Sequence, residues 1–228
     1  MVRPRGLVIA VDGPAGAGKS TAAQAMAAML GLLYLDTGAM YRALALKALR
    51  RDVDVCDGAA LAALLADTAI VLQRTDDGRS QVLLDGDEVS AQLRSPEINA
   101  TVAEVARHRA VREEMVRRQR TLAVAGGVVM DGRDIGTHVL PDADLKFYLT
   151  ASLDARARRR QADLAQLGYT VRFEQLREEI LQRDFVDAGR PHHPLQQAAD
   201  AIVIDTTSQE VSRVVEQMVA RCRQRLAR

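Results

Sequence analysis

Residues 7–21 of the chain are Leu-Val-Ile-Ala-Val-Asp-Gly-Pro-Ala-Gly-Ala-Gly-Lys-Ser-Thr. The stretch opens with consecutive apolar residues, too few for a helix and suited to a strand that is buried on both faces. Gly13, Gly18, Lys19 and Ser20 then match the phosphate-binding pattern G-x-x-x-x-G-K-[ST]. An ordinary glycine-rich turn can also contain Gly-Lys-Ser, but the strand before it and an amphipathic helix after it favour a nucleotide-binding loop.

The residue types of this loop suit the chemistry of phosphate. Small residues let backbone N–H groups point inward around an anion, and the following helix adds the positive end of its dipole. The Lys19 ammonium can reach the β- and γ-phosphates of a nucleoside triphosphate, and the Ser20 hydroxyl can bind Mg²⁺. We therefore expect the whole loop to bind the triphosphate: Gly13, Pro14, Ala15, Gly16, Ala17, Gly18, Lys19, Ser20 and Thr21.

Composition excludes several classes of protein. The 228 residues suffice for a sizeable core, as one domain with insertions or as two small ones. A hydrophobic content of 48% and a formal net charge of +1 argue against a disordered chain and against a polybasic nucleic-acid binder. Lysine occurs only at positions 19, 47 and 146, and all other basic residues are arginine apart from the histidines. An arginine at a site is therefore weak evidence in this chain, whereas Lys19 is strong evidence.

The sequence also predicts a cellular compartment. Cys56 and Cys222 are far apart and match no disulfide or metal spacing, which is typical of reduced thiols. The first residues lack the apolar region of a signal peptide, and no apolar stretch is long enough to span a membrane. We expect a cytoplasmic protein that does not bind membranes.

The next elements predict a parallel sheet. A second short buried strand is expected over residues 32–35, ending at Asp36, and a helix over about 39–51. Strand–helix repeats imply parallel strands joined by right-handed crossovers, with ligands beyond the carboxyl ends of the strands. Asp36, Thr37, Tyr41 and Arg42 are therefore expected at the same edge as the phosphate loop.

Residues 53–100 follow a different pattern. A short helix near 61–65 precedes predicted strands at 69–73, 81–84 and 88–89, separated by hairpin signals at Asp76-Asp77-Gly78 and Asp85-Gly86. A small antiparallel sheet does not belong inside a parallel one. We expect an insertion that packs as a separate lobe.

The remainder returns to the parallel pattern. A long helix is predicted over 100–125, followed by strands at 128–130, 145–149 and 201–205. Asp131, at the end of the first of these strands, is either a metal-side carboxylate or a strand-end carboxylate that accepts turn N–H groups; both interpretations stay open. Thr207 and Glu210 predict a capping box for the last helix, whose buried stripe should comprise Val211, Val214, Val215, Met218 and Val219.

An arginine-rich helical pair lies between the last two of these strands. Ser152 is the expected N-cap of the first helix, which carries Arg156, Arg158, Arg159 and Arg160. A turn at Leu167-Gly168-Tyr169 leads to a second helix over about 172–187. Such a pair can close over phosphates as a lid, although for any single arginine a solvated surface position is the more common situation.

Taken from the residues alone, these features indicate a kinase. Phosphoryl transfer requires in-line positioning and positive charge on the transferred group rather than covalent chemistry. Several arginines near the phosphate loop suit a second phosphorylated substrate. The chemistry indicates a kinase for a small molecule or a nucleotide.

The chain resembles the bacterial cytidylate kinase family over essentially its whole length. The residues that carry the resemblance are the loop 13–21, Asp-Thr-Gly-Ala-Met-Tyr-Arg (36–42), Val-Arg-Glu (111–113) with Arg-Arg-Gln-Arg (117–120), Asp-Gly-Arg-Asp-Ile-Gly-Thr (131–137), and Arg183, Asp184, Asp187 and Arg190. The resemblance implies an α/β fold of the P-loop NTPase type: a five-stranded parallel sheet flanked by helices. It implies a single kinase domain with a core at 1–52 and 101–228, an inserted nucleoside-monophosphate-binding lobe at 53–100, and a short helical lid at about 152–187.

The resemblance further implies transfer of the ATP γ-phosphate to CMP or dCMP with Mg²⁺ bound through Ser20, by a monomer in pyrimidine nucleotide metabolism. Lys19, Arg133 and Arg183 would be catalytic, and Arg159 would join the loop in binding ATP. Arg42 and Arg133 would bind the acceptor phosphate, Arg183 and Asp187 the pentose, and Thr37, Arg112, Asp134 and Arg190 the cytosine. Asp36 and Tyr41 complete the expected substrate-binding set: Asp36, Thr37, Tyr41, Arg42, Arg112, Arg133, Asp134, Arg183, Asp187 and Arg190.

Two alternatives remain at this point. One is another small kinase, acting on UMP, AMP or a metabolite; Asp134 with Arg112 favours cytosine, because uracil presents a carbonyl where cytosine has an amino group. The other is a regulator that binds ATP without transferring phosphate. The chain also departs from the family pattern at Ala103, where a serine is common, at Arg109, where a proline is common, and at Val186.

Overall fold

A computed structural model describes residues 6–75 and 80–227 of the chain. The chain divides into two compact units, which we describe separately. Unit 1 comprises Met1–Leu32 and Gly126–Arg228, and unit 2 comprises Leu33–Ala125. The hairpin signal predicted at 76–78 lies outside the described residues.

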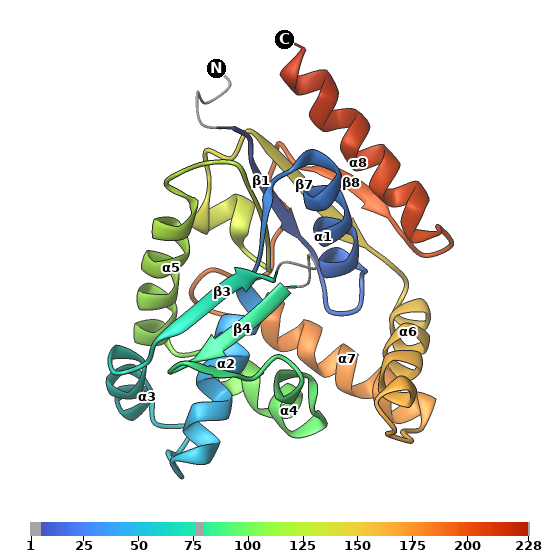
Figure 1. Cartoon of the computed structure of the whole chain (residues 1–228). Coiled ribbons are helices and arrows are strands. Elements are labelled where there is room, and N and C mark those ends of the chain that lie inside the picture. The colour runs from blue at the N-terminus through green and yellow to red at the C-terminus, as the bar shows by residue number, and fades with distance from the viewer. Residues whose placement is uncertain (1–5, 76–79, 228) are drawn as a thin grey trace. The chain divides into compact units, whose positions relative to one another are not determined.

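The central feature is a five-stranded sheet with strand order β2-β6-β1-β7-β8. β1 is parallel to both of its neighbours, pairing Val8 with Val128 and Ile9 with Leu145, and β8 runs parallel to β7. The predicted parallel sheet is therefore confirmed (Figure 1). Its strands are β1 (Val8–Asp12), β2 (Leu33–Asp36), β6 (Val128–Asp131), β7 (Leu145–Thr150) and β8 (Ile202–Asp205).

Burial along the strands follows their position in the sheet. All residues of the central strand β1 are buried, as its unbroken apolar run predicts. β2 lies at one edge of the sheet, and its Leu33 side chain is 40% exposed. The predicted strand is present, with Leu35 buried, but the expected burial of the remaining residues was wrong, because an edge strand has a neighbour on one side only.

Two helices of unit 1, α1 (Lys19–Leu30) and α8 (Val211–Leu226), pack against each other. Gly31 ends α1 with a left-handed φ of 65°. Val214, Val215, Met218, Val219 and Cys222 form the buried stripe of α8, whereas Val211 is 47% exposed and does not belong to it.

The predicted capping box of α8 was wrong. The helix begins after Glu210, and no side chain caps its N-terminus. The Thr207 hydroxyl instead donates to the Asp205 carboxylate at 2.6 Å and accepts the Ser152 N–H at 2.9 Å. The hydroxyl therefore stabilises the loop after β8, because tertiary partners compete successfully with the local cap.

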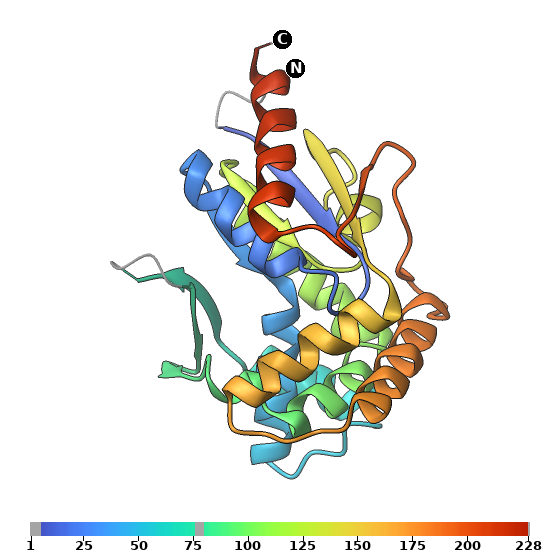
Figure 2. The ribbon, with the colours of Figure 1, turned by 90° about the vertical axis from the view of Figure 1, so that its right-hand side faces the viewer.

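The predicted helical pair is present as α6 (Leu153–Gln166) and α7 (Phe173–Ala188), which pack side by side in Figure 2. Ser152 caps α6 by accepting the Ala155 N–H at 3.3 Å, as expected. Gly168 takes a left-handed φ of 84° in the connection, which agrees with the predicted turn.

Unit 2 contains a three-stranded sheet of order β3-β4-β5, antiparallel throughout. Asp85 and Gly86 connect β4 to β5 with φ values of 52° and 97°, as a two-residue hairpin requires. Helices of this unit share one apolar core with β4. The elements are α2 (Thr37–Arg50), α3 (Gly58–Ala66), β3 (Ile70–Arg74), β4 (Ser80–Leu84), β5 (Asp87–Glu88), the 3₁₀ turn η1 (Gln92–Arg94), α4 (Pro96–Val105) and α5 (Arg109–Ala123).

The single long helix predicted over residues 100–125 was wrong, because α4 and α5 are separate helices. His108 has an extended backbone with ψ of 124° and precedes α5. Its Nε2 lies 2.8 Å from the Val55 carbonyl oxygen. The break between α4 and α5 therefore coincides with a tertiary hydrogen bond, and no glycine or proline marks it in the sequence.

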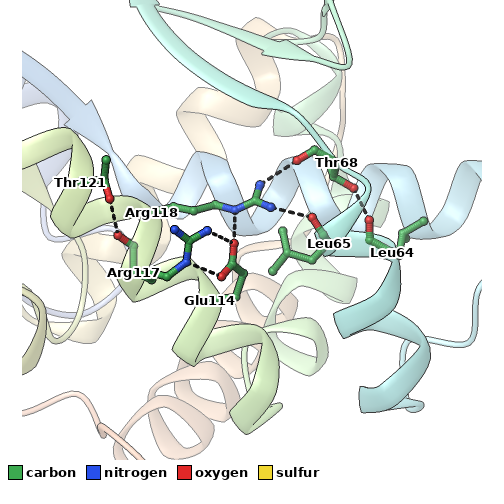
Figure 3. A network of polar contacts seen from close by, with 7 residues as sticks. All are labelled: Leu64, Leu65, Thr68, Glu114, Arg117, Arg118 and Thr121. Carbon is green, nitrogen blue, oxygen red and sulfur yellow. Dashed lines mark hydrogen bonds and ion pairs between the residues drawn. The ribbon is translucent and has the colours of Figure 1, made fainter.

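A polar network joins α5 to the end of α3 (Figure 3). Arg118 donates to the Leu65 and Thr68 carbonyl oxygens, each at 2.7 Å, and so satisfies backbone groups at the C-terminus of α3. Glu114 accepts hydrogen bonds from Arg118 at 2.6 Å and from Arg117 at 2.7 Å. The arginine-rich segment 117–120 thus has a structural role within unit 2.

This network predicts an acid-sensitive contribution to stability. The Arg117 hydrogen bond, opposed by desolvation and reinforced by Arg118, lowers the pKa of Glu114 from 4.5 to about 2. A lowered pKa in the folded state means that the contribution is complete above pH 4.5 and disappears as the pH falls toward 2. We expect Glu114→Gln to lower the urea midpoint at neutral pH and to flatten its decline with acid. Equal declines in both proteins would contradict the assignment.

No helix among the described residues is long and apolar enough to cross a membrane.

Candidate active site

The phosphate-binding loop connects β1 to α1 within unit 1. Gly13 has a φ of 140°, and a Cβ there would lie 1.9 Å from the Leu149 carbonyl oxygen. Gly16 has a φ of 75°, and a Cβ there would approach the Arg156 side chain to 3.0 Å. These positions therefore require glycine, and the loop keeps the open backbone that a phosphate group needs.

Lys19 is the first residue of α1 and is only 5% exposed. Its ammonium donates to the Pro14 carbonyl oxygen at 2.8 Å, across the loop. Burial and the charges of Arg133 and Arg183, opposed by Asp131 and Asp12, lower the pKa of Lys19 to about 7. An anion bound in the loop would relieve this electrostatic cost, so the site favours a ligand as negative as a triphosphate.

Ser20 and Asp131 provide adjacent oxygen atoms. The Ser20 hydroxyl donates to the Asp131 carboxylate at 2.8 Å, and Asp131, at the end of β6, is buried. Mg²⁺ prefers such oxygen ligands and commonly completes its shell with phosphate oxygens and water. The described residues contain no cluster of three or more His, Cys, Asp or Glu side chains suited to a metal. The Ser20 hydroxyl and the Asp131 carboxylate are oxygen donors of the kind that fits a magnesium ion.

A buried carboxylate organises three of the predicted arginines. Asp187, on α7 and 1% exposed, accepts from Arg133 Nε at 2.9 Å and is hydrogen-bonded to Arg190. Arg183 Nε lies 3.9 Å from the same carboxylate. Burial opposes ionisation of Asp187, but the charges of Arg133, Arg190 and Arg183 outweigh it and hold the pKa of the carboxyl below its ordinary value. Three positive groups are thus concentrated around one negative group.

Arginines of α6 lie against the phosphate loop. Arg156 Nη1 donates to the Ala15 carbonyl oxygen at 3.1 Å and pairs with Asp184 at 2.6 Å. Arg159 Nη1 donates at 3.0 Å to the Thr206 hydroxyl, which itself donates to the Ala17 carbonyl oxygen. The expectation that each of these arginines is a solvated surface residue was wrong for Arg156, which is buried.

The predicted residues of unit 2 form two pairs. Asp36 caps α2 by accepting the Ala39 N–H at 2.9 Å and also accepts from Arg42 Nη2 at 2.7 Å. The Arg42 Nε is buried and makes no hydrogen bond within the described part of the chain. The Arg112 guanidinium lies over the Tyr41 ring, 5.8 Å from its centroid, and both Arg112 and Thr37 are buried.

Sequence reasoning missed several residues around the phosphate loop. Asp12, Arg156, Asp184 and Thr206 all contact site elements in unit 1. Asp12 carried a signal, since a carboxylate at the buried end of a strand needs partners. Arg156 lies on the predicted lid helix and Asp184 in a motif of the family, but neither was assigned to the site. Their contacts, and those of Thr206, became visible only when the fold brought α6, α7 and the β8–α8 connection to the loop.

Comparison with known proteins identifies the family of the chain. The family model described as "Cytidylate kinase" matches residues 9–224. Curated cytidylate kinases from Symbiobacterium thermophilum and Pelotomaculum thermopropionicum are each 53% identical to the chain. The first alignment covers 96% of this chain and 97% of its relative, and the second covers 93% and 94%.

A solved shikimate kinase from Bacteroides thetaiotaomicron is 16% identical, with a TM-score of 0.47 over 96% of this chain and 98% of that one. The family match extends over nearly all the described residues and includes every predicted site residue. The chain belongs to the cytidylate kinase family.

Proposed function

We propose that this protein is a cytidylate kinase that transfers the γ-phosphate of ATP to CMP or dCMP, with Mg²⁺, and yields ADP and the diphosphate. One observation carries the proposal. Within unit 1, Lys19 of the phosphate loop is buried, and the positive charges of Arg133 and Arg183, which lie at the Asp187 carboxylate, lower its pKa. A triphosphate-binding loop with further cations beside it suits transfer between two phosphorylated molecules. Membership of the family supports the nucleotide acceptor.

The donor half of the proposal uses the loop from Gly13 to Thr21 together with Arg159. Backbone N–H groups and Lys19 bind the phosphates of ATP. Ser20 would hold the magnesium ion through its hydroxyl oxygen, and the Asp131 carboxylate, which accepts the hydrogen bond of that hydroxyl, would orient it. The metal, when bound with ATP, neutralises phosphate charge.

We propose acceptor-side residues for each unit separately. Unit 1 supplies Arg133 and Arg183 for phosphate charge, which Asp187 holds in fixed orientations. Asp134 and Arg190 are our candidates in this unit for the base. Unit 2 supplies the Asp36–Arg42 pair for the acceptor and, for the base, the remaining candidates: Thr37, Tyr41 and Arg112.

Catalysis in this proposal is electrostatic. Lys19, Arg133 and Arg183 stabilise the charge that spreads over the transferred phosphoryl group, and their fixed positions remove the need for reorganisation during the reaction. We further propose that the protein works as a monomer in the cytoplasm, on free nucleotides rather than on nucleic acid, in keeping with its formal net charge of +1.

Release of ADP from MgATP, with CMP, dCMP, UMP or AMP as the single acceptor, tests the proposal. We expect rapid turnover with CMP and dCMP and little with the other two. Preference for UMP or AMP would identify a different nucleotide kinase. ATP binding without turnover on any acceptor would support a metabolite kinase or a regulator instead.

Asp134→Ala tests the proposed base recognition. Asp134 is buried. We propose that its carboxylate accepts a hydrogen bond from the cytosine amino group, whereas in uracil it would face a carbonyl oxygen, which is another acceptor. Loss of that contact should narrow the preference for CMP over UMP by about 1–3 kcal/mol, or about 5- to 150-fold in the ratio of kcat/KM. The surface substitution Asp142→Ala serves as control. Undiminished discrimination in Asp134→Ala would remove this residue from the base site.

A further inference from the structure

Asp12, the last residue of β1, directly precedes the phosphate loop but binds a different segment. Its carboxylate accepts two backbone N–H groups, from Ile135 at 2.8 Å and from Gly136 at 2.7 Å. Both belong to η2 (Ile135–Val139), a π-helical turn that directly follows Arg133 and Asp134. Asp12 is buried, so both hydrogen bonds are shielded from water.

The contact caps η2 from a distance. The first N–H groups of a helical turn have no partner within the turn, and Asp134, which precedes η2, provides no side-chain cap. The two oxygens of Asp12 satisfy the first two of these groups. At the other end of the turn, the Val139 and Leu140 N–H groups donate to the Asp134 and Ile135 carbonyl oxygens at 3.0 and 2.7 Å.

Gly136 makes the close approach possible. A Cβ at this position would lie 3.0 Å from Lys146 Cδ and 3.3 Å from Asp12 Oδ2. A π-helical turn is rare and often marks a functional site, because it re-aims the residues beside it. The carboxylate and the glycine together hold η2 against the end of β1.

Electrostatics agrees with this geometry. Burial raises the pKa of Asp12 to about 6, while the two N–H groups and Lys19 oppose that rise and Asp134 adds to it. The carboxyl is therefore ionised at neutral pH, and both oxygens are available as acceptors. The burial of a charge so close to Asp134 is unfavourable, and the two backbone hydrogen bonds offset part of that cost.

We infer that Asp12 is a positioning residue for the acceptor side of the reaction, which fixes the orientation of Arg133 and Asp134 by anchoring η2 to the strand that carries the phosphate loop. The inference rests on the proposed function for the roles of Arg133 and Asp134. It assigns Asp12 no contact with either substrate. Small errors in the position of binding groups reduce rates strongly, so this anchor should matter to the acceptor more than to ATP.

Asp12→Asn and Gly136→Ala disturb the same contact from opposite sides. The asparagine keeps one acceptor but opposes an amide NH₂ to the second N–H, and the alanine methyl pushes η2 away from the carboxylate. We expect each variant to raise the KM for CMP about tenfold or more. The affinity for ATP should stay within about threefold of the original, because residues 13–21 keep their side chains and Asp12 affects the pKa of Lys19 less than Arg133, Asp131 and Arg183 do. Assays at about pH 8 keep the Asp12 carboxyl ionised.

Asp144→Ala is the control. The Asp144 carboxylate accepts the Val8 N–H at 2.8 Å at the opposite end of β1, and alanine removes this acceptor, so the variant loses the same kind of hydrogen bond elsewhere on the same strand. We expect a change in stability without a change in the KM for CMP. A purely structural role for Asp12 would make Asp12→Asn behave like this control, and that result would overturn the inference.

Amide hydrogen exchange gives a readout that does not depend on activity. In the protein without nucleotides, the Ile135 and Gly136 amides should exchange slowly, and at least one should exchange about tenfold faster or more in Asp12→Asn. Unchanged exchange would refute the anchor itself. If the unaltered protein does not phosphorylate CMP, the proposed function fails, and the exchange experiment still decides whether Asp12 anchors η2.

Discussion

Lys19→Ala is expected to lower kcat with MgATP and CMP by a factor of about 10²–10³, or about 3–4 kcal/mol of transition-state stabilisation. Lys19 is buried at the start of α1, and its positive charge is repelled by those of Arg133 and Arg183. No other lysine can substitute for it, since the remaining two, Lys47 and Lys146, pair with Asp85 and Asp200. The loss should appear mainly in kcat, because the loop still binds phosphate through backbone N–H groups.

Two further variants separate charge from packing. Lys19→Met keeps most of the side-chain volume and should be as impaired as Lys19→Ala. Lys47→Met removes a buried lysine of unit 2 that donates to the Asp67 carbonyl oxygen at 2.5 Å, and it should lower stability while leaving kcat nearly unchanged. Steady-state kinetics at saturating CMP provides the measurement. A Lys19→Met protein with normal turnover would exclude the proposed catalytic role.

Asp187→Asn is expected to lower the free energy of unfolding by about 3–5 kcal/mol, because it removes one partner of a buried ionic cluster. Its carboxylate, 1% exposed, binds Arg133 and Arg190 and lies near Arg183. Asparagine would leave these positive groups close together without their common counterion. Urea denaturation at neutral pH measures the loss, and we expect the KM for CMP to rise as well, since Arg133 and Arg183 lose their fixed orientation.

The ion pair between Asp154 and Arg177 provides the control, because it joins α6 to α7 on the surface. Its atoms lie 3.0 Å apart, but the side chains are 58% and 49% exposed, so Asp154→Asn should cost about 1 kcal/mol or less. If Asp187→Asn and Asp154→Asn lowered the free energy of unfolding equally, burial would not strengthen the contribution of Asp187, and the prediction would be wrong. A stable Asp187→Asn protein with an unchanged KM would show that the arginines hold their orientation without it.

The fold could be predicted from sequence wherever local signals agreed with tertiary packing. The apolar strands at residues 7–11 and 128–130, the Asp85-Gly86 hairpin and the Gly168 turn are all present, because each depends on residues close together in the chain. The break between α4 and α5 was missed. Arg109 occupies the first position of α5, where a proline would have marked a helix start. The break is instead accompanied by the contact between His108 and Val55, which are far apart in the sequence.

The phosphate-binding loop follows from the sequence alone, because the glycines, Lys19 and Ser20 act through a conformation that a short segment defines. The residue types available for a phosphorylated acceptor are likewise evident in the sequence. The partner of each carboxylate depends on the folded chain: Asp187 binds Arg133, Asp131 binds Ser20, and Asp12 binds the backbone of η2. These pairs join residues more than fifty positions apart. The cost of burying a charge selects such partners by proximity in the folded chain, which spacing along the sequence does not encode.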